Sequence, residues 1–317
     1  MTVQTAAKQG GDKGIQAGIV WFNGQFVPQE EARVSVLAHA LHYGSSVFEG
    51  VRAYRTERGP AVFRLKEHTE RLIHSAHILR MPVPYAFEEI NEAILEVIRR
   101  NGYEECYIRP LVFRGGQSLG VNPLPCPVEA MVAAWYWGAY LGEEAIEQGA
   151  KLVTSSWIRS PGNVMPTKSK AGGNYVNSSL AKADAVSAGF DEALLLDAQG
   201  YVAEGSGENI FFVRHGVLHV IAHSVTLTGI TRDTILHIAR DMNLEVRTVM
   251  ATRDELYTAD EVFMTGTAAE VTPISSIDFR AIGKGTAGEI TKEIRARYLE
   301  IVTGKNPRYD HWLTYVR

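Results

Sequence analysis

The order of the expected strands and helices limits the fold of this 317-residue chain more than any other feature. Strand-like runs gather over residues 19–65, 106–137 and 193–221, and helical patterns form separate runs between and after them. The regular strand–helix–strand alternation of a doubly wound sheet does not occur. Segregated runs of this kind favour an α+β fold. Because the chain is about twice as long as a typical domain, we expect two domains or one large one.

The pattern divides the chain into a polar tail, a small domain and a larger one. We expect a disordered tail over residues 1–17, an N-terminal α+β domain over 18–133, an interdomain crossing over 134–148 and a C-terminal domain over 149–317. The tail lacks an apolar segment typical of a signal peptide. Asn23-Gly24 favours a type I′ hairpin turn within residues 19–27. Strands are expected over residues 45–54 and 106–113, and helices over 66–79, 85–100, 175–188, 230–242, 253–258 and 289–302.

Composition excludes several classes of function. The net charge of −4 and the scattered basic residues give no support for binding to nucleic acid or anionic membranes. Two cysteines, Cys106 and Cys126, cannot form a disulfide framework and fit a reducing compartment. No stretch approaches the roughly 20 apolar residues of a membrane span. We therefore expect a soluble, cytoplasmic protein.

A lysine–glycine turn, Lys168-Ser169-Lys170-Ala171-Gly172-Gly173-Asn174-Tyr175, leads into the helix expected over 175–188. Glycines allow close backbone approach, and a desolvated lysine is an amine that attacks carbonyl groups. On this stretch alone, a basic surface loop is an equally good interpretation. The residues themselves leave open whether Lys168 or Lys170 reacts.

Two further turns have the chemistry of an anion site. Residues 228–231 and 266–270 place glycine and threonine at an expected helix start and after an expected strand. Free N–H groups and a hydroxyl there suit a phosphate, although each turn alone is more often a plain N-cap. Arg71 lies beside the apolar stripe of its helix, where it either reaches a cavity or remains a solvated arginine. Neither a Walker A loop nor a dinucleotide fingerprint is present, which disfavours nucleotides.

Two charged residues occur next to or within apolar strands. Glu204 ends a strand beside a flexible loop and could accept a hydrogen bond from a protonated heterocyclic nitrogen; alternatively, Glu204 and Glu208 are surface acids. Arg109 interrupts the strand expected over 106–113 and needs a partner or a function there. The histidines lack the spacing of metal ligands, so no metal site is expected. No nucleophile elbow is present either.

Taken together, the motifs resemble those of branched-chain amino-acid aminotransferases, which are fold-type IV (class IV) pyridoxal-phosphate enzymes. The resemblance covers nearly the whole chain from the hairpin at Trp21 to beyond Pro273, and the order and spacing of the motifs are specific. The motifs are Ala40-Leu41-His42-Tyr43-Gly44, Val47-Phe48-Glu49-Gly50, Tyr107-Ile108-Arg109-Pro110, Lys170 to Tyr175, Glu204 to Asn209, Gly229-Ile230-Thr231-Arg232 and Gly266-Thr267-Ala268-Ala269-Glu270. The resemblance implies a two-domain α+β fold with the cofactor site between the domains.

The resemblance also assigns cofactor-binding roles. Lys170, which directly precedes Ala-Gly-Gly-Asn-Tyr as in the family, would carry pyridoxal 5′-phosphate as a Schiff base and move the substrate's α-proton. Glu204 would keep the pyridine nitrogen protonated, so that the ring is an electron sink. Tyr175 would bind the ring hydroxyl, and Leu227 would pack on the ring. The phosphate would be held by Arg71, Ile230, Thr231, Gly266 and Thr267.

For the substrate, similar enzymes combine an apolar pocket with a polar region for carboxylates. The resemblance places Phe48, Tyr107, Trp137 and Tyr140 in the pocket, with Tyr43 and Val121 contributed by the partner subunit of a homodimer. Arg109, Thr267 and Ala268 would meet the α-carboxylate or the γ-carboxylate of 2-oxoglutarate. Such a pocket must admit the side chains of leucine and glutamate in turn.

The function implied is reversible ping-pong transamination between leucine, isoleucine or valine and 2-oxoglutarate, by a homodimer or a larger homo-oligomer built from dimers. Alternatives with the same fold are an (R)-amine or D-amino-acid aminotransferase and an aminodeoxychorismate lyase. The sequence differs from the usual family pattern at loop 114–119, segment 223–228 and Lys168. Loops of this kind shape the substrate pocket. The Tyr-Ile-Arg-Pro strand and the Gly-Val-Asn-Pro loop favour the branched-chain interpretation. A non-catalytic binding protein would have lost the lysine or the phosphate turns, and both are present.

Overall fold

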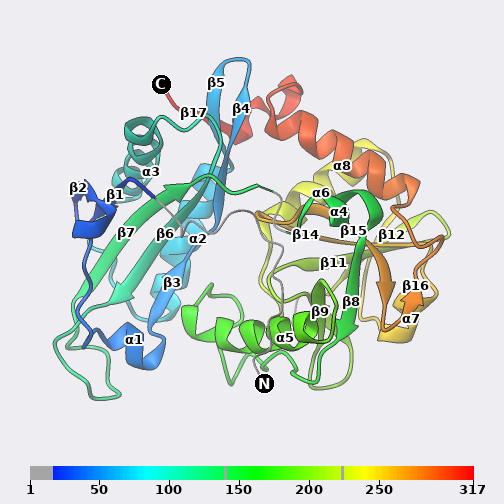
Figure 1. Cartoon of the computed structure of the whole chain (residues 1–317), viewed down its shortest axis with the longest axis horizontal. Helices are drawn as coiled ribbons and strands as arrows, with labels where there is room; N and C mark the ends of the chain where they lie inside the picture. Colours follow the sequence, from blue (N-terminus) through cyan, green and yellow to red (C-terminus); the bar gives the residue numbers. More distant parts are fainter. Residues whose placement is uncertain (1–16, 139–140, 223–224) are drawn as a thin grey trace, which may run out of the picture.

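The computed structural model describes residues 17–138, 141–222 and 225–317. These residues form two lobes, each built on one β-sheet with helices packed against it (Figure 1). The tail expected to be disordered therefore lies outside the described residues except for Ala17, and Tyr140 lies outside them as well. None of the helices within the described ranges is long and apolar enough to cross a lipid bilayer.

The first sheet is antiparallel and is covered by two helices. Its strand order is β17 (Leu313–Tyr315), β5 (Gly59–Phe63), β4 (Val51–Thr56), β6 (Cys106–Arg114), β7 (Val128–Trp135), β1 (Ile19–Phe22) and β2 (Gln25–Pro28), and β3 (Ser46–Phe48) also pairs with β6. Helices α2 (Leu65–Ile78) and α3 (Phe87–Asn101) bury Leu72, Ile90 and Ile94 against it. Short helices η1 (Gln29–Glu31) and α1 (His39–Tyr43) lie in the connection from β2 to β3.

The second sheet is mixed. Its order is β10 (Val202–Glu204), β9 (Glu192–Leu196), β8 (Ala150–Thr154), β15 (Glu270–Ile277), β14 (Glu261–Gly266), β11 (Asn209–Arg214), β12 (Val217–Ile221) and β13 (Val246–Val249), and β16 (Arg280–Ala281) pairs with β15. Strand β8 is parallel to β9 and β15, and β12 is parallel to β13. Its helical elements are α4 (Glu143–Gln148), η2 (Gly172–Asn174), α5 (Tyr175–Ser187), α6 (Ile230–Asp241), α7 (Arg253–Tyr257), α8 (Glu289–Val302) and η3 (Pro307–Trp312).

Most expected elements are confirmed, and one expected strand is wrong in detail. Asn23 and Gly24 both have positive φ, as the hairpin turn requires. The single strand expected over residues 45–54 is instead β3 followed by β4. Glu49 still donates its N–H to the carbonyl of Pro110, but a proline has no N–H to return. The ladder with β6 is therefore interrupted between the two strands.

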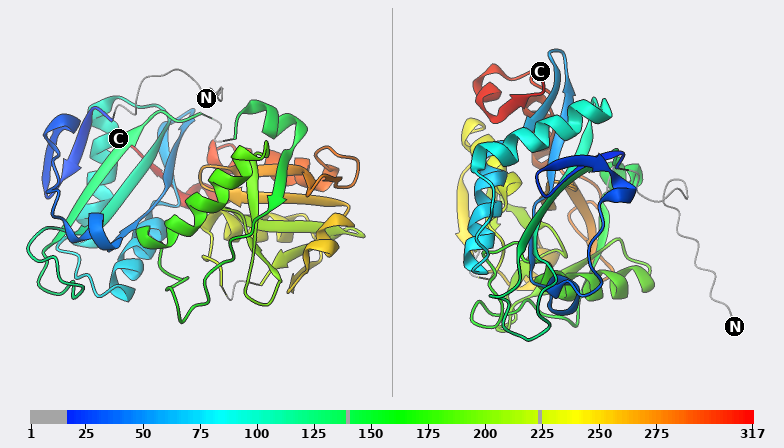
Figure 2. Two further views of the ribbon diagram at one scale, coloured as in Figure 1. Left: turned by 60° about the horizontal axis from the view of Figure 1, so that its bottom comes forward. Right: turned by 90° about the vertical axis from the view of Figure 1, so that its left-hand side faces the viewer.

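An apolar core and a backbone contact join the two lobes. The core brings Phe63 of β5 together with Phe211 of β11 and Tyr298 of α8. On the other side, the N–H of Phe48 in β3 donates to the carbonyl of Lys170 at 3.1 Å. Figure 1 and the left view of Figure 2 place α5 at the junction of the lobes. The lysine–glycine turn that precedes α5 is thus held where the two sheets meet.

Candidate active site

Lys170 is fixed through its backbone and directs its amine toward Tyr175. Its N–H donates to Ser75 Oγ of α2 at 3.1 Å, and its Nζ donates to Tyr175 Oη at 2.8 Å. Close approach to β3 requires Gly172, because a Cβ there would lie 2.3 Å from Ser46 Oγ. The turn therefore places one amine beside one phenol at the junction of the lobes.

Lys168, the other candidate amine, is directed elsewhere. Its Nζ donates to the carbonyl of Thr226 at 2.6 Å. It lines a separate cavity with His74 and His77 of α2. The two lysines of the turn thus face different surroundings.

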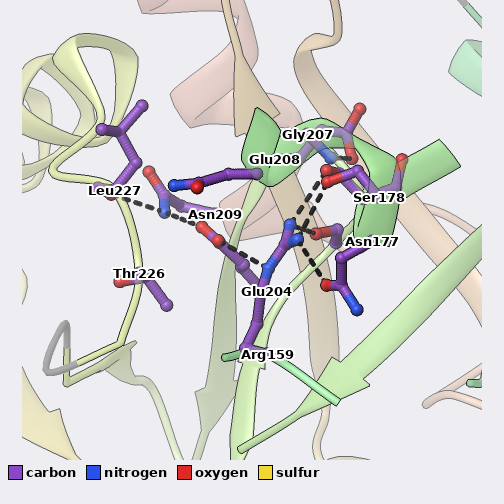
Figure 3. A network of polar contacts seen from close by, with 12 residues as sticks. Arg159, Asn177, Ser178, Glu204, Gly207, Glu208, Asn209, Thr226 and Leu227 are labelled. Atoms are coloured by element: carbon purple, nitrogen blue, oxygen red, sulfur yellow. Dashed lines mark hydrogen bonds and ion pairs between the residues drawn. The ribbon is translucent and has the colours of Figure 1, made fainter. Parts of the chain in front are cut away.

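Glu204 is a buried acid in the same region (Figure 3). Its Oε1 lies 2.9 Å from Nε of Arg159, and its Oε2 accepts from Asn209 Nδ2 at 3.3 Å. The Nε–H of Arg159 does not point along that short separation, so the pair is an ion contact without a linear hydrogen bond. Burial raises the pKa of Glu204, and the positive charges of Arg159 and Lys170 offset only part of this effect.

Two adjoining cavities, each of about 60 Å³, join these groups into one cleft. Both are lined by Arg159, Lys170, Tyr175, Glu204 and Leu227. The second cavity continues to the two expected anion turns and is also lined by Arg71, Gly229, Ile230, Thr231, Gly266 and Thr267. The structure therefore brings together all nine residues predicted to bind the cofactor.

The start of α6 forms one wall of this cleft. The first N–H groups of an α-helix have no partner within the helix and attract anions. Gly229 precedes the helix, and a Cβ on it would lie 2.1 Å from Asn209 Oδ1. Thr265 Oγ1, also on the cleft wall, is buried without a hydrogen-bond partner. This end of the cleft thus offers donors to a ligand.

Arg71 is held by a buried acid that the sequence reasoning did not identify. Glu49 is fully buried, and its carboxylate accepts from Arg71 Nε at 2.6 Å and from Nη2 at 2.8 Å. His68 Nδ1 lies 2.7 Å from the same carboxylate. Burial would raise the pKa of Glu49, but the charge and hydrogen bonds of Arg71 outweigh it and leave the pKa lowered. Burial lowers the pKa of His68, so a neutral ring donates its Nδ1–H.

Glu49→Gln should lower the free energy of unfolding by about 3–5 kcal/mol, because it leaves the Arg71 cation in a buried site without its counter-charge. Urea unfolding near pH 7 measures this change. The matched control is Glu293→Gln, which breaks an exposed ion pair with Arg297 on α8 and should cost less than about 1 kcal/mol. Equal effects of the two substitutions would contradict the assignment.

The residues predicted to bind substrate fall into two groups. The first group surrounds the amine side of the cleft and consists of Phe48, Tyr107, Arg109 and Trp137. Arg109 Cζ lies 4.5 Å from the ring centre of Phe48. Arg109 Nη2 donates to Tyr107 Oη, and the Trp137 ring packs on the Tyr107 ring. Lys170 Nζ lies 5.1 Å from the Phe48 ring centre. Arg109 is half-buried, and its Nε atom has no hydrogen-bond partner among the described residues.

The second group stands on the surface of the chain. Tyr43 is 48% exposed and Val121 is 79% exposed. Tyr43 Oη donates to the carbonyl of Leu119 at 2.8 Å, which ties α1 to the loop that carries Val121. Ala268 is half-buried beside Thr267, which lines the cleft.

Sequence reasoning missed two charged residues of the site. Arg159 lies in a polar segment with nothing to distinguish it from other arginines. Glu49 had a detectable signal, because it stands between apolar residues in an expected strand, as Arg109 does. Among the described residues, no three His, Cys, Asp or Glu side chains gather as metal ligands would.

Comparison with known proteins identifies the family of this chain. The model of the amino-transferase class IV family matches residues 46–277. The branched-chain-amino-acid aminotransferase of Pseudomonas aeruginosa is 48% identical over 300 residues, covering 95% of this chain and 98% of the relative. That of Escherichia coli (strain K12) is 47% identical over 303 residues, covering 95% and 98%. A crystal structure of the Escherichia coli branched-chain amino acid aminotransferase superposes with a TM-score of 0.93 and 46% identity, over 95% of this chain and 100% of that one. Another crystal structure, of a branched-chain amino acid aminotransferase with pyridoxamine 5′-phosphate, superposes with a TM-score of 0.94 and 67% identity, over 96% and 100%. This chain belongs to the class IV aminotransferases.

Proposed function

We propose that the protein is a pyridoxal-phosphate-dependent branched-chain amino-acid aminotransferase. It would transfer the amino group of L-leucine, L-isoleucine or L-valine to 2-oxoglutarate, and back. The observation that carries the proposal is one cleft lined by the Lys170 amine, the buried Glu204 carboxylate and the N-terminus of α6. The relatives of that name, at 47–48% identity over nearly the whole chain, support the choice of substrate.

The cleft fits pyridoxal phosphate in the chemistry of its donors. An amine suits the aldehyde, a buried acid suits the ring nitrogen, and helix N–H groups suit the phosphate. The unpartnered Thr265 Oγ1 and the close packing at Gly229 lie at the phosphate end. When bound, the cofactor would supply an electron sink for the electrons released at the substrate's α-carbon.

Two residues would act at the reacting end of the cleft. Lys170 Nζ would hold the cofactor through its aldehyde carbon, and, once the substrate's amine has displaced it, the free Lys170 amine would accept the proton of the substrate's α-carbon. Tyr175 Oη, 2.8 Å from that nitrogen, would orient the amine and contact the ring hydroxyl. Glu204 would hold a proton on the ring nitrogen, and Leu227 would pack against the ring face.

The remaining residues would hold the two charged ends of the ligands. Arg71 and the turns at Ile230, Thr231, Gly266 and Thr267 would bind the phosphate. On the substrate side, Phe48, Tyr107 and Trp137 would exclude water from the apolar side chain. Arg109, Thr267 and Ala268 would meet the carboxylates, and the position of Arg109 beside the Phe48 ring, which Lys170 also approaches, supports its role. Tyr140 would complete the pocket.

We further propose that the working unit is a cytoplasmic homodimer in which Tyr43 and Val121 enter the partner's site. The two segments joined by the Tyr43–Leu119 hydrogen bond carry exposed apolar side chains, which supports the proposal that a partner subunit covers this surface. These side chains are Val36, Leu37, Leu41, Leu119, Val121 and Leu124. The free thiols Cys106 and Cys126 fit a reducing compartment. A monomeric mass in sedimentation equilibrium would contradict the dimer.

A substrate panel tests the specificity. With 2-oxoglutarate as acceptor, L-leucine should give a kcat/KM about 10–200-fold above those of D-alanine and (R)-1-phenylethylamine, because one mismatched side chain in an apolar pocket costs about 1–3 kcal/mol. Faster turnover of D-alanine or of the (R)-amine would replace the branched-chain assignment by one of the alternatives.

A further inference from the structure

Arg159 connects three segments around the cleft (Figure 3). Its Nη1 donates to Asn177 Oδ1 at 3.1 Å and to Ser178 Oγ at 2.9 Å, both on α5. Its Nη2 donates to the carbonyls of Gly205 and Ser206, each at 2.9 Å. These contacts engage all four terminal N–H groups of the guanidinium. The side chain is only 11% exposed, so its orientation is fixed from both sides.

The remaining guanidinium nitrogen, Nε, lies next to Glu204. This nitrogen lies 2.9 Å from Oε1, and within the described part of the chain Arg159 is the cation paired with this carboxylate. Lys170 and Lys168 act on Glu204 only through longer-range attraction. Because burial opposes the charged form of an acid, the ionisation of Glu204 depends on Arg159 more than on any other of these groups.

The contacts also join Glu204 to the rest of the site. Helix α5 begins at Tyr175, whose phenol accepts the Lys170 hydrogen bond, and Arg159 holds the same helix at its next turn. Asn209 secures the other carboxylate oxygen and also donates to the carbonyl of Leu227 at 3.1 Å. Arg159 therefore sets the position of the acid relative to the phenol and the amine.

We propose that Arg159 is a positioning residue for the proposed transamination: it holds Glu204 as an oriented carboxylate opposite the ring nitrogen of the cofactor. The proton between the two groups then resides on the nitrogen, because the adjacent guanidinium stabilises the carboxylate. Without Arg159, the shared proton returns to Glu204 and the ring becomes a weaker electron sink. The inference rests on the proposed function, since it requires pyridoxal phosphate in this cleft.

The test compares Arg159→Gln and Arg159→Lys with the wild-type holoenzyme loaded with ring-¹⁵N pyridoxal phosphate. In the wild type we expect the ¹⁵N chemical shift of a protonated ring nitrogen. Arg159→Gln should move the shift toward that of an unprotonated pyridine and raise the cofactor dissociation constant about tenfold, because removing an opposite charge next to a carboxylate changes its ionisation by about one pKa unit or more. It should lower kcat for L-leucine more than it changes KM. Arg159→Lys keeps the charge but loses the planar fork, so the nitrogen stays protonated while cofactor binding weakens.

Arg214→Gln is the matched control, because Arg214 also donates to a backbone carbonyl, that of Glu255, but lies outside the cleft. It should leave the ¹⁵N shift unchanged, which separates local positioning from a general loss of stability. A protonated nitrogen in Arg159→Gln, or an unprotonated one in Arg159→Lys, overturns the role of Arg159. A wild-type protein that binds no pyridoxal phosphate overturns the proposed function, and the inference with it.

Discussion

Lys170→Ala should reduce transamination between L-leucine and 2-oxoglutarate by at least about 10⁴-fold, because the substitution removes a nucleophile and a general base together. The Nζ of Lys170 is the amine of the turn that lines the cleft and contacts the Tyr175 phenol. Alanine leaves the backbone contacts with Ser75 and Phe48 intact. The loss should therefore appear in kcat rather than in the stability of the fold.

Lys168→Ala is the matched control for this experiment. It removes an amine two residues away that points to the carbonyl of Thr226, so activity should stay within a few-fold of the wild type. Borohydride reduction of the holoenzyme followed by peptide mapping gives a second readout: the cofactor should be attached to Lys170 in the wild type and in Lys168→Ala. A cofactor fixed on Lys168, or a normally active Lys170→Ala protein, would contradict the assignment.

Local sequence signals predicted the elements that depend on local chemistry. The hairpin at Asn23-Gly24 followed from turn geometry. Helices α2 and α3 followed from periodic apolar residues, and Gly102 and Gly189 indicated the ends of α3 and α5. Pairings between distant segments have no such signal. Strand β17 at the C-terminus returns to the first sheet beside β5, with Leu313 opposite Phe63. Tertiary packing decides such an arrangement. A three-residue strand is too short to carry a sequence signal for it.

The site shows the same division. Residue types and the order of motifs identified Lys170, Glu204 and the two anion turns, and the structure brings these groups into one cleft. The turn's own sequence could not distinguish Lys170 from Lys168. The structure separates them because Lys170 donates to Tyr175, five residues further on, while Lys168 donates to the carbonyl of Thr226, 58 residues along the chain. The partners of the charges, Glu49 for Arg71 and Arg159 for Glu204, lie 22 and 45 residues apart, beyond the reach of local patterns.

Glu204→Gln should lower kcat for L-leucine by about 10²–10³-fold, within the range that one well-placed charged group contributes to catalysis. The amide keeps the size of the side chain and its contact with Asn209, but it cannot hold a proton on the ring nitrogen. Stopped-flow absorbance of the first half-reaction measures the effect. The substitution also leaves Arg159 without its counter-charge. The free energy of unfolding should therefore be measured as well, to distinguish a loss of activity from a loss of folded protein.

Glu208→Gln is the matched control for Glu204→Gln. Glu208 is buried four residues away, but its neighbour is another acid: burial, together with the charge of Glu192, raises its pKa to about 8. This environment favours the neutral form of Glu208, which the amide mimics. We expect activity within about threefold of the wild type, because an interaction with a neutral group is preserved. A large loss in Glu208→Gln, or none in Glu204→Gln, would reverse the roles of the two acids.

The pH dependence of stability provides an independent check on the same pair. A carboxyl whose folded-state pKa is about 8, against an ordinary value of 4.5, binds its proton more tightly in the folded protein. Its contribution is fully present below pH 4.5 and is lost as the pH rises through 8, where the folded protein must hold a buried charge. Glu208→Gln has no proton to lose there. Its free energy of unfolding should therefore exceed that of the wild type at pH 9 and approach it near pH 5, whereas a difference independent of pH would show that Glu208 is ionised at neutral pH.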